Sequence, residues 1–153
     1  MSTVDDLRRD LDKDELDYPA LAEQYGAAAL PDLRSLVAED EPRIASKAAY
    51  LAGLIAGPES HEVVALAAHS RHDVVRVSAA SALLNLPTEQ ADQAAHIAEL
   101  LLDDADSGVR ARAVRSAIRL ERPALSQRIR AMAESDPEPA VRDLVEGLAG
   151  LKS

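Results

Sequence analysis

The chain has 153 residues, no Cys, Phe or Trp, 47% hydrophobic residues and a formal net charge of −10. The lack of Cys excludes disulfides, thiolate metal sites and cysteine nucleophiles, and the acidic balance argues against general binding to phosphate backbones. Because no apolar stretch is long enough to span a membrane and no signal-peptide core follows Met1, we expect a cytoplasmic protein.

Apolar spacing and turn residues predict an all-helical chain. Ala and Leu, which are strong helix formers, are frequent, and no window shows sustained strand alternation. The expected helices span residues 3–12, 19–25, 30–39, 43–56, 60–69, 74–86, 89–102, 108–121, 124–134 and 139–151. Residues 4–17 hold seven acids against three basic residues, which we interpret as the solvated surface of acidic N-terminal capping helices over residues 1–26.

From residue 27 onward, four stretches of the chain can be aligned. Each has an apolar helical segment, an acidic turn and an aliphatic anchor that opens a second helical segment. The anchors are Ile44, Val75, Val109 and Val141, with separations of 31 (75−44), 34 (109−75) and 32 (141−109) residues. This period predicts a solenoid over residues 27–153, and we expect the anchors to be buried. The four repeats are placed at 27–57, 58–87, 88–122 and 123–152.

The turn before each anchor and the residue after it also recur. Arginine follows three anchors, as Arg76, Arg110 and Arg142, whereas the first repeat has Ala45 at this position. An acid stands five residues before three anchors, as Glu39, Asp104 and Asp136, whereas the second repeat has Ser70.

The runs at 72–76, 106–110 and 138–142, of which the second reads Asp-x-x-Val-Arg, resemble the HEAT-repeat family. The similarity is greatest to its short bacterial form, often called HEAT-like or phycobilisome-lyase-like, and covers residues 27–152. It implies a right-handed α-α superhelix of the armadillo-like kind. It also implies that the three arginines form a polar ladder with acids of their own or the preceding turn, such as Glu41, Asp104 and Asp106. Some relatives handle bilins, but no residue here marks such a site.

A stripe of arginines marks the helix expected at 108–121. Its members are Arg112, Arg115, Arg119 and Arg122, which fall within about 80° of arc on a face away from the core positions. The resemblance places this helix on the concave surface, where the first repeat contributes Lys47, Tyr50 and Leu54. These seven residues form the candidate partner-binding surface. The arginines either face solvent or pair with neighbouring acids, or they capture an acidic peptide, a partner surface or a phosphate through their guanidinium forks.

We interpret the chain as a non-enzymatic scaffold or adaptor of prokaryotic composition, whose partner is another protein with an acidic segment as the candidate contact. One alternative is an anion- or cofactor-handling, lyase-like HEAT protein that uses a basic concave groove. A second alternative is a nucleic-acid-associated protein. The chain's aromatic residues are only three tyrosines, which disfavours this alternative because base stacking requires aromatic side chains. No catalytic motif and no metal-ligand spacing is present, so no catalytic residue, metal or cofactor is predicted.

Overall fold

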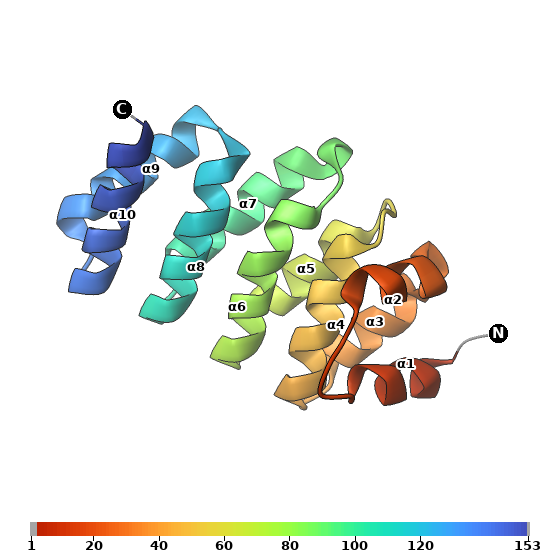
Figure 1. Cartoon of the computed structure of the whole chain (residues 1–153). Coiled ribbons are helices and arrows are strands. Elements are labelled where there is room, and N and C mark those ends of the chain that lie inside the picture. The colour runs from red at the N-terminus through yellow and green to blue at the C-terminus, as the bar shows by residue number, and fades with distance from the viewer. Residues whose placement is uncertain (1–2, 153) are drawn as a thin grey trace.

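The computed structural model describes residues 3–152, and the side chains up to residue 148. These residues form helices and no strand, as predicted (Figure 1). The α-helices are α1 (Val4–Leu11), α2 (Tyr18–Tyr25), α3 (Leu30–Ala38), α4 (Pro42–Leu54), α5 (Ser60–Ala68), α6 (Asp73–Ala82), α7 (Ala91–Leu102), α8 (Ser107–Ala117), α9 (Pro123–Ser135) and α10 (Pro139–Lys152). Short 3₁₀ turns over 83–85 and 118–120 extend α6 and α8.

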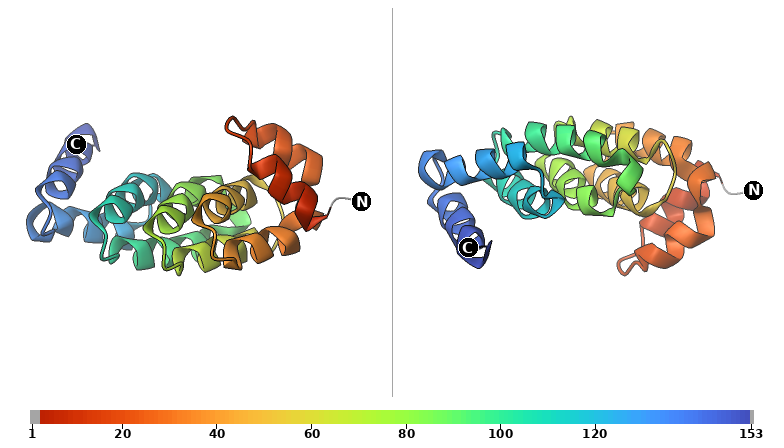
Figure 2. Two further views of the ribbon diagram at one scale, coloured as in Figure 1. Left: turned by 90° about the horizontal axis from the view of Figure 1, so that it is seen from below. Right: turned by 90° about the horizontal axis from the view of Figure 1, so that it is seen from above.

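The helices stack as a two-layer solenoid, which confirms the predicted architecture. Helices α3, α5, α7 and α9 form an outer layer, and α4, α6, α8 and α10 form an inner layer that faces the viewer in Figure 1. At both ends the chain turns towards the same side (Figure 2). At one end α1 and α2 project from the inner layer, and at the other end α10 tilts away from the plane of α4, α6 and α8. The inner layer is therefore framed by two end walls.

The core lies between the two layers, where large leucine and isoleucine side chains of the outer helices meet valines and alanines of the inner helices. All four anchors are buried, with 0% exposure for Val75 and Val109 and 1% for Ile44 and Val141, as predicted. Alanines between the anchors let neighbouring helices approach closely. At Gly53 a Cβ atom would lie 2.9 Å from the Cβ of Ala82, so α4 and α6 meet without room for another methyl group.

The arginines after the anchors form a ladder along one edge of the stack. Arg76 donates from Nε to Asp104 Oδ2 at 2.7 Å and from Nη1 to the Ser70 carbonyl at 2.9 Å. Arg110 donates from Nε and Nη2 to the carboxylate of Asp136, both at 2.9 Å, and from Nη1 to the Asp104 carbonyl at 2.9 Å. Each of these two arginines thus bonds a backbone carbonyl of its own turn and the acid of the following turn.

The predicted direction of this ladder was wrong. We expected each arginine to pair with an acid of the same or the preceding turn. In Arg76 and Arg110, one edge of the guanidinium instead binds backbone carbonyls of the arginine's own turn. The other edge points along the stack to the next repeat. Asp106 serves as the N-cap of α8 and accepts from the Val109 amide at 3.0 Å. Glu41 lies 3.4 Å from Arg8. Arg142, in the last repeat, donates to the Asp136 carbonyl at 2.7 Å.

The same register explains two irregularities of the repeat. An arginine at position 45 would face an acid at position 70, and these are the positions where the chain has Ala45 and Ser70. The arginine and the acid that would form the ladder pair between the first two repeats are therefore both absent. The turns of the first two repeats are joined instead by Asp40, which pairs with Arg71 and lies 2.6 Å from Nε2 of His72.

The N-terminal helices are anchored by contacts that the interpretation of a solvated cap did not include. Leu7 and Leu11 are buried in the core, and Arg8 binds Glu39 with two hydrogen bonds of 2.7 Å. Tyr25 donates to Asp10; burial and this hydrogen bond raise the pKa of Tyr25 to about 12. Among residues 3–152, no helix has both the length and the apolar character needed to cross a membrane.

Candidate functional site

A hollow of about 910 Å³ lies on the inner layer and extends from Tyr18 of α2 to Leu148 of α10. We call it the groove. Side chains from α4, α6 and α8 form most of its surface, with one residue each from α2 and α10 at its ends. It is lined by Tyr18, Ser46, Lys47, Tyr50, Val74, Val77, Ser78, Ser81, Leu84, Arg112, Arg115, Ser116, Ile118, Arg119 and Leu148.

The groove brings together five of the seven predicted site residues, namely Lys47, Tyr50, Arg112, Arg115 and Arg119. Leu54 and Arg122 lie outside it. Leu54 is the last residue of α4 and is half-buried.

Arg122 is separated from the stripe by a reversal of the chain. The helical register of α8 ends in a 3₁₀ turn, and Glu121 adopts left-handed backbone angles (φ 55°, ψ 40°). Arg122 is consequently the N-cap of α9, where its Nη2 lies 2.7 Å from the carboxylate of Asp92. A uniform turn of 100° per residue, on which the predicted stripe depended, does not continue past the end of a helix.

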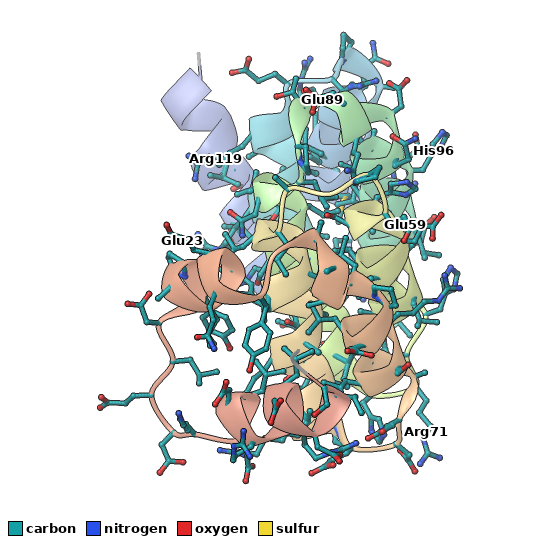
Figure 3. All side chains as sticks on the ribbon, turned by 90° about the vertical axis from the view of Figure 1, so that its right-hand side faces the viewer. Glu23, Glu59, Arg71, Glu89, His96 and Arg119 are labelled. Carbon is teal, nitrogen blue, oxygen red and sulfur yellow. The ribbon has the colours of Figure 1, made fainter. Side chains whose placement is uncertain are left out.

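Within the described part of the chain, Arg112, Arg115 and Arg119 make no ion pair, and the groove is lined by no Asp or Glu. Of the four arginines of the stripe, Arg122 pairs with the neighbouring acid Asp92. The other three have no such pair among the described residues, and their guanidinium groups line the groove. Figure 3, viewed along the stack, shows Arg119 on the side of α2 and α10, opposite His96 on α7. The charge of the groove is thus concentrated on α8.

The opposite end of the groove is aromatic, and its cation is already engaged. Lys47 donates from Nζ to the carbonyls of Leu11 and Lys13, both at 2.9 Å, and so holds the connection between α1 and α2. Tyr18 meets Tyr50 edge-on with ring centroids 4.8 Å apart. Burial, with a smaller contribution from Tyr50, raises the pKa of Tyr18. This end offers aromatic surface and no free positive charge.

Sequence reasoning missed the apolar surface in the middle of the groove. Val74 and Leu84 line the groove with 48% and 39% exposure. A signal was present in the sequence, since Val74, Val77 and Leu84 recur at i, i+3 and i+10.

No family model and no curated protein matches the sequence. Among solved structures, the fold is similar to that of a chain in the complex of CpcE and CpcF of phycocyanin lyase from Nostoc sp. PCC7120. The TM-score is 0.69 at 24% identity, over 83% of this chain and 84% of that chain. The likeness establishes the helical-repeat fold that the sequence resemblance predicted. In the described residues, no three His, Cys, Asp or Glu side chains are grouped so as to hold a metal ion.

Proposed function

We propose that this protein is an interaction module whose groove binds an acidic segment of another protein. The observation that carries this proposal is the set of three groove arginines without an acidic partner among the described residues. Most arginines elsewhere in the chain contrast with them, and among the described residues only Arg130 and Arg142 likewise make no ion pair with a carboxylate. Those that form ion pairs with carboxylates are Arg8, Arg9, Arg34, Arg43, Arg71, Arg76, Arg110, Arg122 and Arg128.

Three unpaired guanidinium groups on one helix face repel one another, because like charges three or four residues apart destabilise a helix. A ligand with two or three carboxylates removes this repulsion and gains bidentate hydrogen bonds. The overall charge of −10 keeps acidic partners away from the rest of the surface, so the local basic patch also selects where such a partner docks. The groove is open along its length and presents apolar side chains beside the charges, which suits a protein surface.

Two alternatives share the same groove. A lyase-like role in handling an anionic cofactor is favoured by the aromatic end at Tyr18 and Tyr50 and by the shared fold with a chain of the phycocyanin lyase complex. A nucleic-acid role is favoured only by the arginines themselves. We favour the protein partner because the basic surface is confined to one helix and continues into apolar side chains.

The test is binding of a fluorescein-labelled peptide of about 12 glutamates, measured by fluorescence anisotropy from about 50 to about 300 mM NaCl. We expect wild-type protein to bind and binding to weaken as salt rises. Arg115→Glu should abolish binding, whereas Arg130→Glu should not. Arg130 is a matched control because it is exposed on the outer layer, and no ion pair is formed there among the described residues.

Both substitutions should leave the melting temperature nearly unchanged, because exposed residues rarely contribute more than about 0.5 kcal/mol. Equal binding by the two variants would overturn the proposal. Preferential binding of citrate or of oligothymidylate over the peptide would instead support the cofactor or the nucleic-acid alternative.

A further inference from the structure

We infer that the segment bound in the groove is an amphipathic helix with an acidic stripe beside an apolar stripe. This inference rests on the proposed function and specifies its ligand. It follows from two rows of side chains on neighbouring inner helices. The apolar row consists of Val74, Val77 and Leu84, and the basic row consists of Arg112, Arg115 and Arg119.

The two rows lie side by side along the groove. Helices α6 and α8 pack against each other in the inner layer, and all six residues line the same hollow. The apolar row occupies positions i, i+3 and i+10 of α6 and its extension, and the basic row occupies i, i+3 and i+7 of α8 and its extension. Each row therefore follows the axis of its own helix for two to three turns.

The apolar row is exposed to an unusual degree for this molecule. The described part of the chain exposes the large hydrophobic side chains Val74 (48%), Leu84 (39%) and Leu100 (41%), and the first two belong to the row. Leu100 lies apart from them, on α7 in the outer layer. Large apolar side chains gathered in a hollow beside unpaired charges are typical of a binding site for a protein segment.

Small serine side chains form part of the surface of the hollow. Ser46, Ser78, Ser81 and Ser116 line the hollow and leave room for a helix backbone. The hydroxyl of Ser78 donates to the Ser46 carbonyl at 2.5 Å, and that of Ser81 donates to the Val77 carbonyl at 3.2 Å. A helix, whose backbone groups are already satisfied internally, can lie against this surface without hydrogen bonds from these hydroxyl groups.

The arrangement favours a helix over an extended strand. Successive side chains of a strand point to opposite faces, so acidic and apolar residues that alternate along it cannot both reach two adjacent rows on one floor. On a helix, two stripes about 100° apart face adjacent rows together. Carboxylates at i, i+4 and i+7 of the ligand rise about 10 Å, close to the rise from Arg112 to Arg119.

The test uses two fluorescein-labelled peptides of roughly 18 residues and identical Glu, Leu, Ala and Lys composition. In the first, Glu and Leu form adjacent helical stripes; in the second, the same residues are scrambled so that no stripe exists. We expect the striped peptide to bind at least about fivefold more tightly and to gain helical circular dichroism on binding. The variant Val74→Ser/Leu84→Ser should lose this preference and keep the weaker binding of the scrambled peptide.

Leu100→Ser is the matched control, because it removes an equally exposed apolar side chain from the outer layer and should bind both peptides like the wild type. Equal affinity of the wild type for both peptides, or an unchanged preference in Val74→Ser/Leu84→Ser, would overturn the helix inference while the acidic-segment function stands. If neither peptide nor the glutamate probe binds, the proposed function fails as well.

Discussion

Removing the guanidinium of Arg110 should destabilise the fold far more than removing an exposed arginine. The Arg110 side chain is 11% exposed and the Asp136 side chain 3%, and two hydrogen bonds of 2.9 Å join them. In Arg110→Met, the Glu138 amide at 2.9 Å is the remaining hydrogen-bond donor to the Asp136 carboxylate. The substitution also removes the donors to the Asp104 and Ala105 carbonyls. Breaking a buried pair from one side costs about 3–5 kcal/mol.

The matched control is Arg122→Met, which removes an arginine whose pair with Asp92 is 38% and 80% exposed on its two sides. Exposed pairs contribute at most about 1 kcal/mol. Urea denaturation followed by circular dichroism at 222 nm gives both values. If the two variants lose the same free energy of unfolding, the ladder does not hold the repeats together in the way we describe.

The same pair gives a pH dependence with a definite sign. The hydrogen bond from Arg110 holds the pKa of Asp136 below its usual range, against the opposing effect of burial, and the Glu138 amide adds to the lowering. Because the folded-state pKa is depressed, the stabilisation is fully present above the unfolded value of about 3.9 and is lost as pH falls through the folded value. The stability gap between wild type and Arg110→Met should therefore narrow below about pH 4.

Further substitutions test the core and the ladder pair that is absent between the first two repeats. Val109→Asp, at a residue with 0% exposure, buries a charge and should lower the free energy of unfolding by about 3 kcal/mol or more in urea titrations. Gly53→Ala should lower the melting temperature although it improves helix propensity by about 1 kcal/mol, because its Cβ would lie 2.9 Å from that of Ala82; a higher melting temperature would show that α4 and α6 can separate. Ala45→Arg should destabilise alone and be partly rescued by Ser70→Asp, and a double-mutant cycle without favourable coupling would contradict the ladder register.

Much of the fold could be predicted because the same weak sequence pattern recurs in successive repeats. A single buried valine says little, but Val75 and Val109 at equivalent positions indicate the same packing environment in successive units. The approximate helix ends could be predicted from apolar spacing and turn residues. The direction of the ladder was not, because a period states which residues are equivalent and not which side of an arginine faces the next unit. Only the position of the Asp104 and Asp136 carboxylates decides that.

The groove was predictable to a smaller extent. Arg112, Arg115 and Arg119 share a face by simple helical geometry, which holds while the helix is regular. That geometry failed for Arg122, where the chain reverses at Glu121. The position of Tyr18 at the aromatic end of the groove could not be predicted, because the sequence indicates where α2 begins but not the direction in which α2 packs over α4.

The apolar row was missed for a different reason. Val74 and Val77 are residue types that normally face a core, so their spacing indicates burial as readily as a binding surface. Only their exposure in the structure and their position beside the arginines separate these two interpretations.

Hydrogen–deuterium exchange tests the central claim most directly, because it reports where a ligand binds. We predict that the striped acidic peptide slows amide exchange in segments 74–85 and 109–119 of the inner layer and leaves exchange in α5 and α7 of the outer layer unchanged. Arg115→Glu should erase this pattern and Arg130→Glu should preserve it. Protection confined to the outer layer, or protection that persists in Arg115→Glu, would contradict the assignment of the groove as the binding face.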